Sequence, residues 1–177
     1  MRQFVQHFNL RFKSRDPTLR ARTMPKIVLV NPEIPPNTGN IARTCAATGT
    51  PLHLVFPIGF ELTDKYLKRA GLDYWPYVDL HLHDSIQDFW AHVKTQPGKC
   101  IGFSARTTKS YTDISYSADD WLLFGKESQG LCADTLDRCD LLATIPMTTN
   151  HVRSLNLSVS AAVGLFEAIR QTQPLTQ

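Results

Sequence analysis

Short apolar runs alternate with amphipathic segments along most of the chain. The apolar runs with the length and residue types of buried strands span 26–31, 52–56, 77–82, 100–104, 120–124 and 141–145. The segments with the apolar spacing of helices span 63–70, 85–94, 133–139 and 156–171. Strands that alternate with helices predict an α/β fold, with a mostly parallel sheet covered by helices on both faces.

A further helix is expected between the first two strands. The prolines at positions 32, 35 and 36 fix their own φ angles and disfavour helix in the preceding residue, so they predict an extended loop. Thr38 or Asn40 then supplies a side-chain cap for a helix that runs to about Thr48. Gly49 is the expected stop of this helix.

Length and composition fit one folded domain. The chain has 177 residues, with 42% apolar and 20% charged residues, which is typical of a globular protein. No apolar run approaches the roughly 18 residues that a membrane span needs. The first 23 residues lack the apolar centre of a secretory signal. We therefore expect a cytoplasmic protein with no membrane partner.

Positive charge is concentrated near the N-terminus. Residues 1–23 carry a net charge of +5, whereas the remainder carries −2. A basic arm on a near-neutral domain is typical of nucleic-acid binding. A start codon upstream of the true start at Met24, or a flexible tail, explains the arm equally well. We expect a folded domain over 24–172, with a basic extension over 1–23 and a short tail over 173–177.

The cysteines and histidines do not predict a metal site or a disulfide framework. The four cysteines form no C-x-x-C pair, and a chain of this size does not need disulfides, so free thiols are expected. The histidines include no H-E-x-x-H motif, and His81 and His83 have no matching second pair in the sequence. We expect no bound metal.

Several common motifs of α/β enzymes are missing. No G-x-G-x-x-G follows the first expected strand, which argues against a dinucleotide site. Gly125 and Gly130 have the spacing of a phosphate-binding P-loop, but Leu131 and Cys132 replace its lysine and hydroxyl residue. The absence of G-x-S-x-G argues against an α/β-hydrolase.

Three polar segments instead follow expected strands. They are P-E-I-P-P-N-T-G-N-I-A-R at 32–43, F-G-K-E-S-Q-G at 124–130 and I-P-M-T-T-N-H-V-R-S-L-N-L-S at 145–158. Loops that follow the carboxyl ends of parallel strands gather at one edge of the sheet, where ligands bind. The three segments can therefore form one site.

In this order, N-T-G-N-I-A-R, F-G-K-E-S-Q-G and I-P-M…S-L-N-L-S resemble the three motifs of the SPOUT RNA 2′-O-ribose methyltransferases. The longer stretch P-E-I-P-P-N-T-G-N-I-A-R-T-C-A-A-T-G, with L-H-L-V-F-P-I-G-F and A-G-L-D-Y-W, resembles the small single-domain subgroup that methylates the wobble ribose of tRNA. The resemblance runs from about Pro25 to Gln171. The short stretch before the first strand is expected to leave no room for the separate RNA-binding domain of ribosomal-RNA relatives.

The resemblance implies a fold, a cofactor and an assembly. The family fold is an α/β sheet whose C-terminal segment forms a deep trefoil knot, and the active form is a homodimer with sites near its interface. The methyl donor is S-adenosylmethionine, held mainly by backbone groups of the knot loops, and the substrate implied here is tRNA. By position, the implied cofactor-binding residues are Arg106, Gly125, Ile145, Ser154 and Leu155.

The resemblance also implies catalytic roles. Arg43 matches the invariant arginine of the first motif. A guanidinium group keeps its proton at neutral pH and is a poor base, so we expect Arg43 to bind an RNA phosphate and orient the 2′-hydroxyl. Glu127 is expected to orient Arg43 or a group of a partner chain, and Arg153 to contact a phosphate; a solvated loop position is the alternative for each. Asn40 and Asn156 are expected to orient the ribose or, alternatively, to cap helices.

Other functions stay open on the sequence alone. The same chemistry on another tRNA or rRNA ribose is one, and a non-catalytic RNA-binding protein on the same scaffold is another. Two features depart from the family pattern. The spacer at 149–152 is one residue longer than usual, and Phe166 stands where several relatives have tyrosine.

Overall fold

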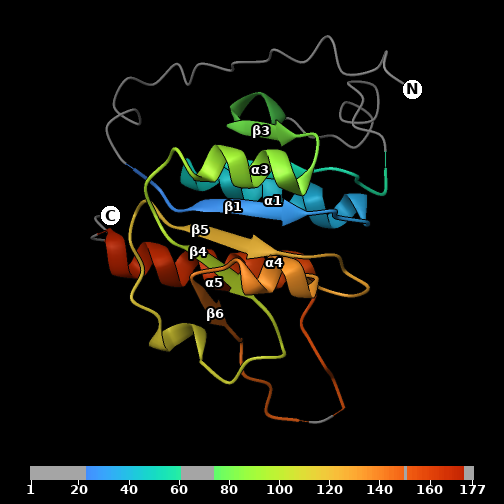
Figure 1. Ribbon diagram of the computed structural model, residues 1–177, viewed down its shortest axis with the longest axis vertical. Coiled ribbons are helices and arrows are strands. Elements are labelled where there is room, and N and C mark those ends of the chain that lie inside the picture. Colours follow the sequence, from blue (N-terminus) through green and yellow to red (C-terminus); the bar gives the residue numbers. More distant parts are fainter. Residues whose placement is uncertain (1–22, 61–73, 150, 174–177) are drawn as a thin grey trace.

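The computed structural model describes residues 23–60, 74–149 and 151–173, and within them it shows one six-stranded sheet (Figure 1). Every strand pair is parallel, in the order β3-β2-β1-β5-β4-β6, which confirms the predicted sheet. The helix expected at 63–70 and the arm over 1–22 lie outside the described residues. The strands are β1 (Lys26–Val30), β2 (Leu52–Val55), β3 (Leu80–His83), β4 (Cys100–Phe103), β5 (Trp121–Phe124) and β6 (Leu141–Ala143).

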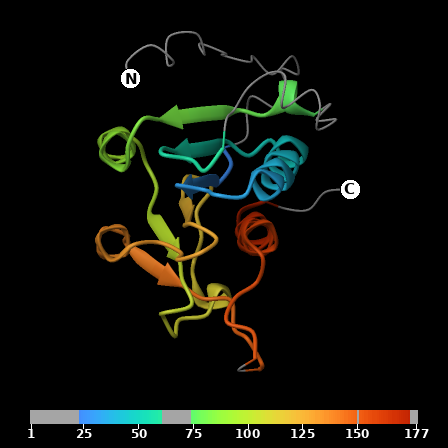
Figure 2. The ribbon, with the colours of Figure 1, turned by 90° about the vertical axis from the view of Figure 1, so that its right-hand side faces the viewer.

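Helices cover both faces of the sheet, as the pattern predicts. Figure 2 shows α1 and α5 on one face and α3 and α4 on the other. None of the helices in the described part of the chain is long and apolar enough to cross a membrane. The α-helices are α1 (Pro35–Thr48), α3 (Ile86–Val93), α4 (Ala133–Asp137) and α5 (Leu157–Thr172), and the 3₁₀-helices are η2 (Trp75–Tyr77) and η3 (Tyr111–Asp113).

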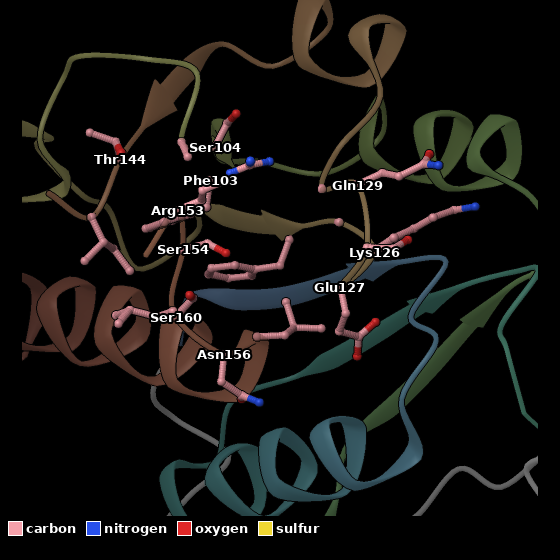
Figure 3. Close-up of a pocket in the computed structure, with 18 of the residues that line it drawn as sticks. Phe103, Ser104, Lys126, Glu127, Gln129, Thr144, Arg153, Ser154, Asn156 and Ser160 are labelled. Carbon is pink, nitrogen blue, oxygen red and sulfur yellow. The ribbon is translucent and has the colours of Figure 1, made fainter. Parts of the chain in front are cut away.

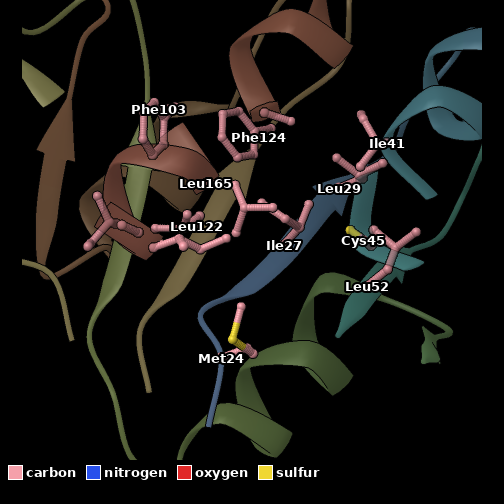
Figure 4. Close-up of a cluster of buried hydrophobic side chains, with 14 of the residues drawn as sticks. Met24, Ile27, Leu29, Ile41, Cys45, Leu52, Phe103, Leu122, Phe124 and Leu165 are labelled. Carbon is pink, nitrogen blue, oxygen red and sulfur yellow. The ribbon is translucent and has the colours of Figure 1, made fainter. Parts of the chain in front are cut away.

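The alternation of side chains along each strand divides the core into two clusters. Ile27 and Leu29 of β1 face α1 and α5, where they pack with Leu165 (Figure 4). The alternate residue Val28 faces α3 and packs with Phe89. Successive side chains of a strand point to opposite faces, so one short apolar run supplies both clusters. The cysteines are all free thiols, as predicted.

The strand order places a natural binding edge near the middle of the sheet. Going along the chain, β1, β2 and β3 build outwards in one direction, while β5, β4 and β6 lie on the other side of β1. Such a reversal leaves a crevice at the carboxyl ends of the strands on either side of it. Here those strands are β1 and β5, which pair from Lys26↔Trp121 to Leu29↔Phe124.

Helix α1 begins at Pro35, so the cap predicted at Thr38 or Asn40 is wrong. Both residues lie inside the helix, and the N-cap is Ile34, which has no side-chain cap bond. The first two helical residues are prolines. A helix leaves its first N–H groups unpaired, so a proline loses nothing there and its φ already suits the helix. The predicted stop at Gly49 is confirmed by its left-handed backbone, with φ of 68°.

The strand predicted at 77–82 is shorter and begins later. Residues Trp75–Tyr77 form the 3₁₀-helix η2, with Pro76 in its first turn. Strand β3 begins at Leu80, which pairs with Leu52 at the start of β2. The alternation of apolar residues therefore predicted the strand correctly, but the proline and the register with β2 set where it starts.

Candidate functional site

A cavity of about 700 Å³ opens at the carboxyl edge of the sheet (Figure 3). Its walls come from the segments after β4, β5 and β6 and from the first turns of α1 and α5. Small-molecule sites typically have volumes of roughly 300–1,000 Å³. The three polar segments singled out in the sequence all contribute to this cavity.

Two stacked aromatic rings form an apolar part of the cavity wall. Phe103, at the end of β4, and Phe124, at the end of β5, have ring centroids 4.5 Å apart and planes 22° apart. Gly164 of α5 lets the helix lie against this pair, because a Cβ at that position would be 2.6 Å from the Phe103 ring. Helix α5 therefore packs directly on the Phe103 ring at Gly164, while its Leu157 and Ser160 line the cavity.

The loop after β5 turns back on itself at the cavity. A Cβ on Gly125 would overlap the carbonyl carbon of Gly130 and the backbone nitrogen of Leu131. The turn is closed by the N–H of Gly130, which donates to the carbonyl of Lys126 at 2.8 Å, and Gly130 has φ of 72°. Glycine at position 125 is therefore a steric requirement of the fold-back, and it holds the loop where Gly125 lines the cavity.

Glu127, in the same loop, binds the start of α1. Its carboxylate accepts hydrogen bonds from the backbone N–H of Glu33 at 2.8 Å, the backbone N–H of Ile34 at 3.2 Å and the side-chain amide of Asn37 at 3.0 Å. This helix has no side-chain cap of its own. A carboxylate from a distant loop supplies the acceptors and places a negative charge where the helix dipole favours it.

Asn37 and Asn156 extend this contact to the start of α5. The amide of Asn156 donates to Oδ1 of Asn37 at 3.0 Å. Oδ1 of Asn156 accepts from the N–H and hydroxyl of Ser158, at 2.8 and 2.7 Å, which caps α5. Glu127, Asn37 and Asn156 thus form a polar chain that joins the three motif segments. The sequence pattern did not predict a role for Asn37, which is only 5% exposed and links the other two residues.

The loop of Glu127 and the segment before α1 hold each other in both directions. While Glu127 accepts from the N–H of Glu33, the carboxylate of Glu33 accepts from the N–H of Ser128 at 3.2 Å. Hydrogen bonding by Ser128 lowers the pKa of Glu33 below its ordinary value, and the charge of Lys126 acts in the same direction. Both carboxylates are thereby used to fasten one loop to the other.

The predicted site residues divide into two groups. All five expected cofactor-binding residues line the cavity, together with Glu127, Asn156 and Arg153. Arg43 and Asn40 do not: both lie on the exposed face of α1. The guanidinium of Arg43 lies 4.7 Å from the ring centroid of Tyr74, and no ion pair joins it to Glu127 among the described residues. The cofactor-binding positions in the first group are Arg106, Gly125, Ile145, Ser154 and Leu155.

A second polar cluster lies away from the cavity, between the sheet and α3. His53 of β2 stacks on His81 of β3 with ring centroids 4.4 Å apart, and its Nδ1 is 2.9 Å from Nε2 of His83. His92 of α3 and the ring of Trp121 complete this histidine cluster. His53 and His92 thus join His81 and His83 in the fold, a grouping that the sequence did not reveal. Within the described ranges, no group of three His, Cys, Asp or Glu side chains is arranged to hold a metal ion.

Burial keeps two of these histidines neutral. It lowers the pKa of His53 to about 2, and the neighbouring histidines and Lys26 act in the same direction. It also lowers the pKa of His83 to about 4, again with help from His92 and His81. His53 and His83 are therefore uncharged at neutral pH.

Comparison with known proteins agrees with the resemblance found in the motifs. A protein of Synechocystis that carries the provisional name tRNA (cytidine(34)-2′-O)-methyltransferase is 59% identical over 152 residues, which cover 86% of this chain and 99% of that protein. The tRNA (cytidine(34)-2′-O)-methyltransferase of Burkholderia ambifaria is 44% identical over 147 residues, covering 82% and 94%.

Solved structures agree on the fold. One from work on the 2-OH methylation of C/U34 on tRNA has a TM-score of 0.75 at 50% identity, covering 84% of this chain and 96% of that one. The SpoU methyltransferase AviRb of Streptomyces viridochromogenes, solved with its cofactor AdoMet, has a TM-score of 0.74 at 23% identity, covering 85% and 61%. The model of the SpoU rRNA Methylase family matches residues 24–166. The chain therefore belongs to the SpoU methylase family.

Proposed function

We propose that this protein is a tRNA 2′-O-methyltransferase that transfers a methyl group from S-adenosylmethionine to the ribose of nucleotide 34, the wobble position. One observation carries the proposal: the five cofactor positions implied by the family resemblance come from three separate segments and line a single cavity. The substrate rests on the relatives, which are 44–59% identical and named for methylation of cytidine 34 in tRNA.

The cavity fits the proposed methyl donor in size and in chemistry. Its volume of about 700 Å³ accommodates a nucleoside with an amino-acid arm. The Phe103–Phe124 pair offers an apolar surface, Gly125 lines the cavity without a side chain of its own, and the exposed residues Arg106 and Arg153 also line it. S-adenosylmethionine, when bound, supplies an electrophilic methyl group on a sulfonium centre.

Arg43 is the proposed RNA anchor. Its planar guanidinium can donate two parallel hydrogen bonds to a phosphate and a further one to the ribose hydroxyl, which orients the attacking oxygen. Because a guanidinium keeps its proton, the proton released by the 2′-hydroxyl passes to another acceptor. Orientation of this kind, rather than proton transfer, is the contribution that we assign to Arg43.

The polar chain of Glu127, Asn37 and Asn156 has a positioning role in this proposal. It ties the start of α1 to the loop at Gly125 and to the start of α5. Arg43 lies two turns further along α1, so these bonds fix the direction of its helix relative to the cavity. A shift of about 1 Å in such a group is enough to slow a reaction about a hundredfold.

A homodimer completes the proposed site. Arg43 is exposed on α1 and does not line the cavity of its own chain. Helix α5, which packs beside α1, exposes Val159 (46%) and Phe166 (52%) to solvent. A second copy that covers α1 and α5 would bury these side chains and bring Arg43 of one subunit toward the cavity of the other.

The trefoil knot of the SPOUT fold is likewise proposed for the C-terminal segment. After β6, at the edge of the sheet, the chain returns to α5, which packs against β5 and beside α1. This return from the edge to the middle supports a threaded path, as does the likeness of the whole fold to SpoU methyltransferase structures.

The proposal is tested by methyl transfer from labelled S-adenosylmethionine to tRNA, with the product mapped by nuclease digestion and mass spectrometry. We expect label on the 2′-oxygen of nucleotide 34. Label on another ribose would retain the reaction and change the substrate. Cofactor binding without transfer to any tRNA would overturn the proposed activity. In the same assay, Arg43→Ala is expected to bind the cofactor with unchanged affinity and to lose turnover.

A further inference from the structure

The ring of Tyr74 lies against the guanidinium of Arg43. The guanidinium carbon is 4.7 Å from the ring centroid, which is the geometry of a cation–π contact. Tyr74 reaches this place from the segment between β2 and β3, just before η2. It is half-buried and packs against the aliphatic core on its other side.

The ring is fixed relative to α1 as well as to Arg43. The hydroxyl of Tyr74 donates a hydrogen bond to the carbonyl of Gly39 at 2.8 Å. Gly39 lies one helical turn before Arg43, and side chains in a helix lean toward its N-terminus, so Arg43 extends over the place where Tyr74 is held.

We propose that Tyr74 is a positioning residue for Arg43, and this inference rests on the proposed function of Arg43. An exposed arginine samples many rotamers, and each unproductive one reduces the fraction of enzyme that is ready to bind the phosphate and the ribose hydroxyl. The ring restricts the guanidinium to one plane over α1. The hydrogen bond to Gly39 in turn restricts the ring, so that the orientation of the guanidinium is set by the backbone of the helix that carries it.

A positioning role for Tyr74 predicts a different result from a role in fold stability alone. Removing the ring should lower turnover and leave the cofactor cavity as it is, because Tyr74 does not line that cavity. For Tyr74→Leu we expect kcat with tRNA to fall about threefold to thirtyfold, the range of a cation–π contact between exposed and desolvated sites. The Kd for S-adenosylmethionine should stay within about twofold of wild type.

Two further variants separate the parts of the contact. Tyr74→Phe keeps the ring and loses the bond to Gly39, so its kcat should lie between wild type and Tyr74→Leu. Tyr77→Leu is the matched control, since it removes an aromatic ring that is 76% exposed and only three residues away; it should behave as wild type. Melting temperatures are recorded for each variant. Tyr74→Met, whose unbranched and flexible side chain reaches further into the space of the ring, replaces Tyr74→Leu if that variant melts early.

The experiment uses the full chain, labelled S-adenosylmethionine and substrate tRNA, with Arg43→Ala measured alongside. A Tyr74→Leu enzyme that matches Tyr77→Leu, while Arg43→Ala is inactive, overturns this inference alone. Loss of cofactor affinity in parallel with kcat also overturns it, because that result would indicate a general disturbance of the fold. Wild-type turnover by Arg43→Ala would instead remove Arg43, and with it the proposed mechanism.

Discussion

The carboxyl edge of the sheet and the histidine cluster under α3 both gather polar side chains from distant parts of the chain, with opposite results. At the edge, Glu127, Asn37 and Asn156 bond to one another and to helix starts, and a cavity of about 700 Å³ stays open beside them. In the histidine cluster the rings of His53 and His81 stack in nearly parallel planes, 8° apart, so they pack against each other.

The difference follows from where each group lies along its strand. Residues just beyond a strand have backbone groups without sheet partners, and their side chains bond to those groups and to helix ends. Residues inside a strand project at right angles to the sheet and meet whatever the register places beside them. His53 pairs with His81 in that register, and His92 of α3 packs against His53. A polar residue therefore points to function more strongly after a strand than within one.

The strongest way to break this comparison is to disturb the backbone at the cavity. Gly125→Ala places a methyl group where the loop folds back on Gly130, and no flexible side chain is present to yield. We expect the affinity for S-adenosylmethionine to fall about a hundredfold or more, which is about 2.7 kcal/mol, measured by calorimetry.

Gly130→Ala in the same loop is the matched control for that change. Position 130 has φ of 72° and open space around the added methyl group. Gly130→Ala should therefore lower the affinity for S-adenosylmethionine by only about 1 kcal/mol, through backbone strain. Equal losses from the two substitutions would show that the fold-back at Gly125 has no special part in cofactor binding.

The free energy of unfolding should fall in acid, because burial keeps His53 and His83 neutral in the folded protein. An unfolded histidine binds a proton below about pH 6.5, whereas His53 and His83 have folded pKa values of about 2 and about 4. The unfolded state therefore binds more protons over that range. The stabilising contribution of these two histidines is at its full value above about pH 6.5. It decreases as the pH falls, by about 1.4 kcal/mol per pH unit for each histidine. Urea unfolding between pH 7 and pH 5 measures this slope.

Substitution of the cluster members tests whether they cause the acid response. His53→Leu replaces the most buried ring by an apolar side chain of similar size, and it should reduce the slope by about one proton. His92→Gln removes a less buried member whose pKa is also lowered by burial, and its effect should be smaller. A slope that is unchanged in His53→Leu would mean that the acid sensitivity arises elsewhere in the chain.

The sequence predicted most of the edge and little of the histidine cluster. Apolar runs located the strands, and the family resemblance implied five positions that the fold brings to one cavity. The start of α1 was mispredicted because no local side chain caps it: the segment before the helix is held by Glu127, which lies 94 residues from Glu33 along the chain. Asn37 was overlooked for the same reason, since its partners are distant in sequence. The stacking of His53 on His81 depends on strand register, and local pattern carries no information on it.

Asn156 offers the finest test, because it both caps a helix and belongs to the polar chain. Asn156→Ala removes both contacts and should lower the free energy of unfolding by about 1 kcal/mol, the usual value of a cap. Asn156→Asp keeps an oxygen to accept from Ser158 and loses the amide that donates to Asn37. Asn37 cannot compensate by turning its amide, since its own N–H group is bound by the Glu127 carboxylate. The aspartate variant should therefore keep the cap of α5, lose stability only through the unpaired oxygen of Asn37, and transfer methyl groups more slowly. If it is as active as wild type, the bond between the two asparagines has no part in catalysis and Asn156 serves only to cap α5; the edge would then be no more specialised for function than the histidine cluster.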